Sequence, residues 1–341
     1  MSAMITRARF MLAAAAALTV VGLTTIPARA EVAEVRLARQ FGVVYAPILI
    51  MEHQKLIEKH AVAKGMPDLK VNWTQFAGPA VMNDAILSNS IDFTAQGLPS
   101  LATLWDRTRN TIGVKGVAAI NDSPVYLNTR NPNVKSIKDF TDKDRIALTS
   151  IKVSIQAIYL QIAAEKAFGV GKHTQLDHLT VGIPHPEAMA AVLGGASEIS
   201  AHFVGEPFHT NEMKGGLKTV LNSFEIMGGP STVIAFVSTE KFRTDNPKVF
   251  AIVLAAYDEA LAFINADLRR TAKIYLEMTR DKKTSEDDLV ASISAPEFKF
   301  SKTPKTVGTL VEFMHRVGSV KTKPASWKDL FFPEAHDLPG N

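Results

Sequence analysis

The stretch LKVNWTQFAGPAVMNDAILSNSIDFTAQG at residues 69–97 decides the fold class. It begins with an alternating segment, Leu69–Trp73, that predicts a strand. A helical segment follows over Pro79–Leu87, and its proline suits a first helical turn, where the missing N–H would have no partner in any case. The short apolar segment Ile91–Thr94 predicts the next strand. The stretch is therefore a strand–helix–strand unit, which is typical of a parallel sheet.

The same alternation continues through most of the chain. Strands that alternate with helices form sheets with helices on both faces, so the pattern predicts an α/β fold with parallel sheets. From Pro247 onward the pattern is helical, with capping signals at Ser285 and at Thr303-Pro304. The length favours two domains over one. Further strands are expected at 34–39, 114–119, 125–128, 145–148, 179–181, 199–204, 217–220 and 233–238, and further helices at 48–60, 98–105, 154–168, 186–193, 249–265, 268–278, 285–292 and 304–317.

The first thirty residues have the features of a secretory signal peptide. Arg7 and Arg9 precede an apolar run, Phe10–Val21, and the small residues of Ala28-Arg29-Ala30 suit signal peptidase, so we expect cleavage after Ala30. A retained anchor would need about 20 apolar residues, and Pro27 interrupts the run before that length. Lipoprotein anchoring needs a cysteine, which the chain lacks. We therefore expect a periplasmic protein with no membrane-spanning segment after residue 30.

Charge and cysteine content exclude several classes of function. The chain has 38 Lys and Arg against 34 Asp and Glu, a net charge of +4. Without the three arginines of the leader the count is 35 against 34, which leaves the mature chain near +1. No dense basic run indicates a nucleic-acid partner. The absence of cysteine excludes a disulfide framework, thiolate chemistry and cysteine-based metal sites.

Common catalytic and metal-binding motifs do not occur in the sequence. It has no H-E-x-x-H, no G-x-S-x-G, no G-x-G-x-x-G after a strand and no G-x-x-x-x-G-K-[ST]. The nearest histidine pairs, His173/His178 and His202/His209, lack i,i+4 spacing and a third ligand, so surface or core histidines are the better interpretation. We expect no catalytic residues, no metal and no cofactor.

Four turns between a strand and a helix form the candidate binding site. In open α/β sheets, ligands bind beyond the carboxyl ends of the strands, where N–H groups at helix starts point at them. A glycine after a strand is also ordinary turn chemistry, so the evidence lies in the recurrence of such turns in order along the chain. The four turns are Gln40-Phe41-Gly42, Phe76–Pro79, Ala95-Gln96-Gly97 and Thr149–Ser154.

Five segments carry a resemblance to a known family: VRLARQFG at 35–42, VNWTQFAGPA at 71–80, LSNSIDFTAQG at 87–97, SIKDFTDKDRIA at 136–147 and AHFVGEPF at 201–208. Together they resemble the periplasmic solute-binding proteins of the nitrate/sulfonate/taurine class of ABC importers, a group that includes binders of thiamine precursors. The likeness covers nearly the whole mature chain. The middle segments are the more specific, because a small-x-x-Ile-Asp-Phe pattern followed by a glycine recurs in that class.

The resemblance implies a two-lobed type II periplasmic binding fold, with two doubly wound mixed sheets and a ligand cleft between them. It implies a first lobe of residues 31–121 and 241–341 and a second lobe of residues 122–240. The hinge is expected where the chain crosses between the lobes, near Asn121–Pro124 and Thr239–Lys241. Ligand contacts are implied, by matching position, for Gln40, Phe41, Tyr45, Gly78, Gln96 and Gly97 of the first lobe and for Ser154, Gln156, His202 and Glu206 of the second.

Some of these residues have a plainer interpretation. Phe41 and Tyr45 also fit packing under the first helix, and His202 equally fits a core histidine with satisfied hydrogen bonds. Glu206 fits an acid at the rim better than a direct ligand contact. Gly205 departs from the relatives, many of which carry a bulky aromatic residue there, and we hypothesise that it leaves room for a larger or flatter solute. The identity of the ligand stays open.

The resemblance implies a receptor outside the cytoplasm that captures a small organic solute, anionic or zwitterionic, by closure of its lobes. The expected partners are the solute and an ABC permease with its ATPase, with no nucleic acid, no embedding in the membrane and a monomeric state. Two other classes stay open. One is an exported sensory protein that presents its solute to a receptor. The other is a pyrimidine-synthase-like enzyme of the same fold, whose cysteine-rich signature a chain without cysteine lacks.

Overall fold

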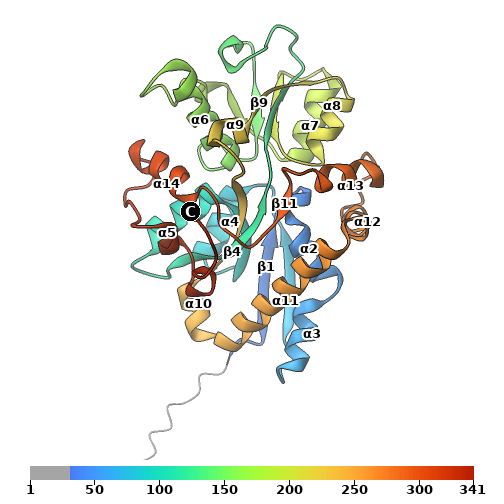
Figure 1. The fold of residues 1–341 in the computed structure, drawn as a ribbon, viewed down its shortest axis with the longest axis vertical. Coiled ribbons are helices and arrows are strands. Elements are labelled where there is room, and N and C mark those ends of the chain that lie inside the picture. The colour runs from blue at the N-terminus through green and yellow to red at the C-terminus, as the bar shows by residue number, and fades with distance from the viewer. Residues whose placement is uncertain (1–30) are drawn as a thin grey trace, which may run out of the picture. The chain divides into compact units, whose positions relative to one another are not determined.

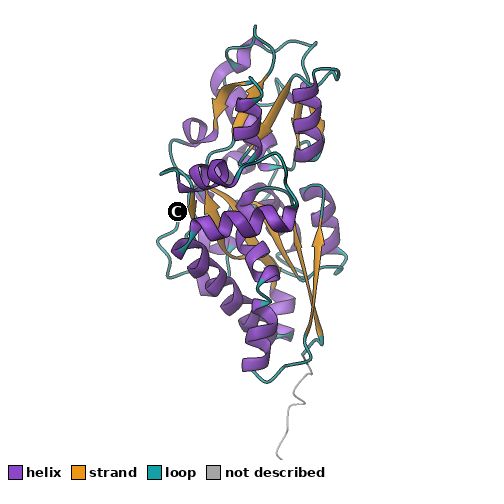
Figure 2. Ribbon diagram, turned by 90° about the vertical axis from the view of Figure 1, so that its right-hand side faces the viewer, coloured by secondary structure: helices purple, strands orange, loops and turns teal. Residues whose placement is uncertain are grey.

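Two sheets organise the chain in the computed structural model of the protein, which describes residues 31–341 (Figure 1). The expected signal peptide therefore lies outside the described residues. One sheet has six strands in the order β11-β4-β10-β3-β1-β2, and the other has five in the order β7-β6-β8-β5-β9. Figure 2 shows helices around both sheets. The predicted α/β fold with two mixed sheets is confirmed.

The six-stranded sheet combines parallel and antiparallel pairs. Strand β1 runs parallel to β2 and β3, whereas β10 runs antiparallel to β3 and β4. The strands are β1 (Glu34–Arg39), β2 (Lys70–Gln75), β3 (Phe93–Gly97), β4 (Val114–Asp122), β10 (Thr232–Thr239) and β11 (Lys299–Phe300).

The five-stranded sheet is mixed in the same way. Strand β6 runs parallel to β7 and β8, and β5 runs antiparallel to β8 and β9. The alternation along the sequence predicts parallel pairing, and β5 and β10 depart from it, in keeping with the mixed sheets that the resemblance implies. These are the strands by which the chain enters one sheet from the other, so no crossover helix constrains their direction. The strands are β5 (Tyr126–Thr129), β6 (Ile146–Leu148), β7 (Thr180–Gly182), β8 (Ala201–Val204) and β9 (Lys218–Asn222).

The helices divide between the two sheets. Around the six-stranded sheet, α11 packs on α2 and α3, α12 packs on α2 and α13, and α5 packs on β4, β10 and α14. These helices, with α4 and α10, are α2 (Ala46–His53), α3 (Leu56–Ala63), α4 (Pro79–Leu87), α5 (Leu98–Thr108), α10 (Glu240–Asp245), α11 (Pro247–Ala266), α12 (Leu268–Thr279), α13 (Glu286–Ser294) and α14 (Val307–Arg316). The five-stranded sheet carries α6 (Ile155–Phe168), α7 (His185–Gly194), α8 (Phe208–Lys214) and α9 (Ser223–Met227). Short 3₁₀ turns are η1 (Val43–Tyr45), η2 (Ile137–Asp139), η3 (Asp177–Leu179), η4 (Trp327–Leu330) and η5 (Pro333–Ala335).

The chain passes between the sheets twice, once between β4 and β5 and once between α9 and β10. The first lobe comprises residues 32–122 and 232–341, around the six-stranded sheet. The second lobe comprises residues 123–231, around the five-stranded sheet. The expected boundary at residue 240 differs from this pairing, because β10 lies between β3 and β4 of the first lobe. The apolar sequence of β10 is compatible with a strand in either lobe, so only its pairing shows which lobe it belongs to.

Three local predictions need correction. The single helix expected over 48–60 is two helices, because Lys55 takes a left-handed conformation (φ 51°) between α2 and α3. The Thr303-Pro304 signal does not begin a helix, since α14 begins at Val307 after Thr306. The third is the expectation that no segment after residue 30 is long enough to span a membrane. Helix α11 has 20 residues and is apolar enough to do so by length and composition alone. Half of its most apolar window is buried in the protein, where α11 packs on α2 and α3. The Ser285 cap is confirmed, since its Oγ accepts from the Asp288 N–H at 3.1 Å.

An ion pair ties β1 to the segment before β3. The buried Asp92 carboxylate accepts from Arg36 Nε at 3.0 Å and Nη2 at 2.7 Å, and also from the Arg36 backbone N–H at 2.8 Å. These bonds to a charged acceptor are among the strong ones in proteins. They fix the two strands whose carboxyl ends carry Gln40 and Gly97.

Candidate functional site

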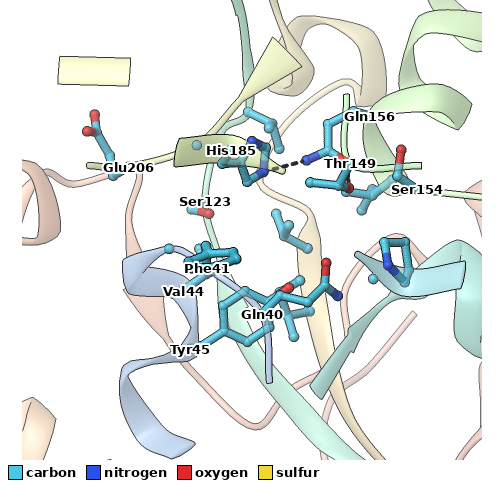
Figure 3. A pocket seen from close by; sticks show the side chains of 18 of the residues that line it. Gln40, Phe41, Val44, Tyr45, Ser123, Thr149, Ser154, Gln156, His185 and Glu206 are labelled. Carbon is cyan, nitrogen blue, oxygen red and sulfur yellow. Dashed lines mark hydrogen bonds between the residues drawn. The ribbon is translucent and has the colours of Figure 1, made fainter. Parts of the chain in front are cut away.

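A cavity of about 560 Å³, open mouth included, lies where the two lobes meet (Figure 3). Polar side chains from both lobes and from the crossing segment reach it, among apolar ones. From the first lobe it is lined by Gln40, Phe41, Gly42, Val44, Tyr45, Pro79, Gly97, Ser100, Val233 and Ile234; from the second lobe and the crossing segment, by Ser123, Pro124, Val125, Thr149, Ser154, Ile155, Gln156, His185, Gly205, Glu206 and Phe208.

The lobes touch around this cavity. The Val43 N–H donates to the Glu206 carbonyl oxygen at 3.2 Å, directly beside the lining residues. At the outer rim, α8 of the second lobe meets the segment around α13 of the first. The bonds there join Thr210 to Ser292 at 3.0 Å, Asn211 to Thr284 at 2.8 Å, and the Lys214 ammonium to the Asp288 carboxylate. The two lobes are thus in direct contact in this structure.

Gly78 of the first lobe faces Thr149 of the second, although it does not line the cavity. Its backbone is extended (φ −173°), so the glycine is not needed for conformational reasons. A Cβ at this position would lie 2.5 Å from the Thr149 carbonyl oxygen. Only a residue without a side chain therefore lets the start of α4 meet the second lobe.

The first-lobe wall is formed by the segments that follow β1 and β3. Gln40 leaves β1 and is buried, and Phe41 and Tyr45 flank the turn η1. Burial raises the pKa of the Tyr45 phenol well above its usual value, so its hydroxyl stays protonated. At the start of α5, the Ser100 hydroxyl is buried on the cavity wall and has no hydrogen-bond partner among the described residues. Such an orphaned hydroxyl is available to a bound molecule.

Gln96 is fully buried beside Gly97 but does not line the cavity. Within residues 31–341 neither its amide nitrogen nor its amide oxygen has a hydrogen-bond partner. An unsatisfied buried amide is costly. Gln96 thus lies one residue from the cavity with both polar atoms free of protein partners.

The second-lobe wall is built on the start of α6. The Ser154 side chain caps this helix by accepting from the Ala157 N–H at 3.3 Å. Thr149 precedes the helix, and its hydroxyl donates to Gln156 Oε1 at 3.4 Å. A helix N-terminus carries partial positive charge and free N–H groups, so this wall favours an anionic or hydrogen-bond-accepting group.

A chain of buried side chains runs from the cavity into the second lobe. Gln156 Nε2 lies 3.2 Å from His185 Nε2, a contact drawn in Figure 3. His185 Nδ1 lies 2.8 Å from His202 Nε2, and His202 Nδ1 lies 2.5 Å from Glu212 Oε1. His202 and Glu212 have no exposed surface. His202 therefore reaches the cavity only through His185.

Burial and charge set the protonation around the cavity. Burial, with a smaller contribution from His202, lowers the pKa of His185 well below its usual value, so this ring is neutral. Burial raises the pKa of Glu206, and its bonds to Thr210 oppose that shift. Among the described residues that line the cavity there is no lysine and no arginine. A ligand here meets hydroxyls, amides, helix starts and one partly buried acid rather than a side-chain cation.

A second, adjacent cavity supplies the cations. It shares Gln40, Phe41, Gly42 and Phe208 with the first and has a volume of about 1120 Å³, its open mouth included. Arg39 lines it, with its guanidinium buried; it donates to Gln75 Oε1 at 2.6 Å and has an Nε without a partner in the described part of the chain. Arg280, Lys282 and Lys283 complete its basic side. Asp281 lines the same cavity and Glu52 lies 3.5 Å from Arg39, so a region with more cations than acids borders the first cavity.

Comparison with known proteins places the chain in a family. A sequence model of the NMT1-like family matches residues 28–276. The chain belongs to the NMT1-like family. A search of curated proteins finds no match.

Solved structures share the fold of this NMT1-like chain at low sequence identity. The alkanesulfonate-binding protein SsuA from Xanthomonas axonopodis pv. citri, bound to MOPS, has a TM-score of 0.67 at 13% identity and covers 88% of this chain and 98% of its own. The periplasmic aliphatic sulphonate-binding protein SsuA from Escherichia coli has a TM-score of 0.62 at 15% identity, and the match covers 89% of this chain and 92% of that protein. The periplasmic nitrate-binding protein NrtA from Synechocystis PCC 6803 has a TM-score of 0.64 at 18% identity, and the match covers 88% of this chain and 84% of that protein. The predicted resemblance to this class is confirmed.

The residues expected to contact ligand in the NMT1-like chain fall into two groups. Gly78, Gln96 and His202 do not line the cavity, for the reasons given above. Gly205, expected to leave room, lies on the wall, and a Cβ there would meet no atom within 4 Å. The lining residues among those expected are Gln40, Phe41, Tyr45, Gly97, Ser154, Gln156 and Glu206.

Several lining residues of the NMT1-like chain escaped the sequence analysis. His185 precedes the expected helix at 186–193 and follows a strand, which is the same turn signal that marked the other four positions. Ser123 lies within the expected hinge at Asn121–Pro124, and Ser100 lies in the first turn of α5; no sequence signal marks either as a residue of the cavity wall. Among the described residues no group of three His, Asp or Glu side chains has the arrangement of a metal site.

Proposed function

We propose that this NMT1-like protein is a solute-binding receptor of an ABC importer, which captures a small organic solute by closing its lobes and delivers it to a membrane permease. The observation that carries the proposal is the cavity lined by both lobes, with the Val43–Glu206 bond closing across it. A ligand that contacts both walls stabilises the closed arrangement by its contacts to the second wall. Closure then reports occupancy to the permease.

The solute that fits is anionic or zwitterionic and partly apolar. Ser100, Ser154 and Gln156 offer hydrogen bonds, and Phe41 and Phe208 offer apolar contact. The start of α6 and the adjacent basic cavity favour a negative group. The sulfonate- and nitrate-binding neighbours support an anionic or zwitterionic solute.

The same proposal covers location and partners. The predicted signal peptide and the periplasmic binding-protein neighbours support a periplasmic receptor rather than an enzyme. We propose that it works as a monomer with a permease and its ATPase. A sensory protein would use the same cavity and closure, and would differ in the membrane protein that it contacts. Neighbouring permease and ATPase genes would distinguish the two.

Thermal unfolding of the mature protein with a panel of solutes tests the proposal. Sulfonates, nitrogen heterocycles, aromatic acids and amino acids would be compared, because the cavity suits several of these classes. A true solute at a hundred times its dissociation constant stabilises the protein by about 2.7 kcal/mol.

The matched variant is Gly205→Trp, which places a large side chain in the open space at the cavity wall. It should abolish the stabilisation while the ligand-free protein stays folded. A stabilisation that survives this substitution would place the solute elsewhere, and no stabilisation by any compound would count against a receptor for small organic solutes.

A further inference from the structure

The buried Glu212 carboxylate anchors a hydrogen-bond chain that ends at the cavity. Its Oε2 accepts from Asn128 Nδ2 at 2.8 Å, and its Oε1 lies 2.5 Å from His202 Nδ1. The Thr219 hydroxyl donates to Asn128 Oδ1 at 2.8 Å, which holds the Asn128 amide with its nitrogen toward the carboxylate. An ionised carboxylate only accepts hydrogen bonds, so His202 Nδ1 must carry the hydrogen in their contact.

Each later contact in the chain follows from this first assignment. A neutral histidine has one donor and one acceptor nitrogen. With His202 neutral and its hydrogen on Nδ1, His202 Nε2 is an acceptor and His185 Nδ1 is the donor to it, whereas a second hydrogen on His202 would reverse this contact. His185 Nε2 is then an acceptor, and Gln156 must present its nitrogen to it. The opposite amide atom, Oε1, is thereby turned toward Thr149 and the cavity wall.

We infer that Glu212 fixes the Gln156 amide through two Nδ1-protonated histidines, so that Gln156 presents its carbonyl oxygen to the solute and selects for a hydrogen-bond donor there. His185, His202 and Glu212 are positioning residues, and Gln156 is the specificity-determining residue. The selectivity for a solute rests on the proposed function, whereas the positions of the histidine hydrogens do not depend on it. It adds an N–H or O–H group to the chemistry of the solute.

The hydrogen-bond chain from Glu212 to Gln156 also has a form in which every donor and acceptor is exchanged. If the hydrogens lie on His202 Nε2 and His185 Nε2, the Gln156 amide turns over and presents its NH₂ group to the cavity. This form would set an acceptor nitrogen of a neutral His202 against a carboxylate oxygen of Glu212, so the 2.5 Å contact between them favours the first form. Other ionisable groups near the chain are Glu206, His209 and Tyr126, and none is hydrogen-bonded to either linking histidine in the described structure.

The isosteric change Glu212→Gln should reverse the whole chain. The Asn128 amide donates to the side-chain oxygen of the new residue, which leaves its NH₂ group facing His202 Nδ1. His202 and His185 then each move their hydrogen to Nε2, and Gln156 turns over. Asp177→Asn is the matched control, because it makes the same acid-to-amide change at the hydrogen-bond partner of Gln161. Gln161 lies on α6 like Gln156 but takes no part in the hydrogen-bond chain.

Long-range ¹H–¹⁵N spectra of the full mature protein test this without any solute, since they identify the protonated nitrogen of each of its nine histidines. We expect Nδ1–H forms at His185 and His202 in the native protein and in Asp177→Asn, and Nε2–H forms at both in Glu212→Gln. An Nε2–H form at His185 in the native protein would overturn the inference. Unchanged forms in a folded Glu212→Gln protein would overturn it as well.

Titration with taurine and ethanesulfonate tests the selectivity, because the two differ in the amino group that can donate. The native protein should prefer taurine by about tenfold, and Glu212→Gln should lose that preference. The same preference in both proteins would overturn the role of Gln156. Failure of both compounds to bind would count against a sulfonate solute in the proposed function, while the spectra still decide the protonation pattern.

Discussion

Replacing Gly78 by alanine should weaken solute binding while the protein stays folded. The extended backbone at Gly78 accommodates alanine at no conformational cost. The added Cβ would lie 2.5 Å from the Thr149 carbonyl oxygen and 3.0 Å from Ser150 Oγ. Both atoms belong to the second lobe, whereas Gly78 belongs to the first. The clash therefore exists only when the lobes are closed, and opening relieves it.

The size of the effect follows from the overlap. Ordinary contact with a Cβ begins near 3.4 Å, so the lobes must stay apart by roughly 0.9 Å at this point. Overpacking of this kind costs about 1–3 kcal/mol. Because binding requires closure, that cost appears in the dissociation constant as a weakening of about 5- to 160-fold.

Isothermal titration with the solute found by thermal screening measures this weakening. Gly194→Ala is the control, since a Cβ there meets no atom within 4 Å and the residue lies away from the cavity. The free energy of unfolding without solute, measured in urea, should be similar for Gly78→Ala, Gly194→Ala and the native protein. A dissociation constant for Gly78→Ala equal to the native value would refute the argument that binding brings these two segments together.

Three further substitutions probe stability and the cavity. Asp92→Ala removes the acceptor of three bonds from Arg36, and because Arg36 itself is partly exposed it should lower the free energy of unfolding in urea by about 2 kcal/mol. Ser154→Ala removes the cap of α6, should cost about 1 kcal/mol of stability in thermal unfolding, and should also weaken the solute in titration because Ser154 lines the cavity. Burial lowers the pKa of His209 to about 4, so the unfolded chain binds the proton more readily and stability is lost as the pH falls from about 6.5 toward 4. The melting temperature should therefore fall less steeply over that range in His209→Gln than in the native protein, and equal slopes would contradict this role of His209.

The elements of the fold could be predicted from the sequence because their signals are local. The alternating segment 34–39 is strand β1, and the proline-led segment 79–87 is helix α4. Turns after strands placed Gln40, Gly97 and Ser154 on the cavity, since a turn at the carboxyl end of a strand faces the ligand side whatever the pairing. Local chemistry was enough for these residues.

The remaining features depend on contacts between distant segments. Strand β10 joins the first lobe through its pairing with β3 and β4, which its own apolar residues do not reveal. His202 has the composition of either a core or a ligand residue, and only its contacts with His185 and Glu212 show it to be one step from the cavity. The need for a glycine at 78 arises from Thr149 of the other lobe. None of these relations has a periodic signal along the chain.

The central claim is that a solute bound between the lobes holds them closed, and the distance across the rim measures this most directly. The chain has no cysteine, so Lys218→Cys in the second lobe and Ala291→Cys in the first, both at exposed positions, give two unique sites for spin labels. Pulsed electron resonance would then be recorded with and without the stabilising solute. The account predicts that the solute increases the fraction of a short inter-label distance, and that Gly205→Trp prevents the increase. A solute that binds and stabilises the protein but leaves the distance distribution unchanged would contradict it.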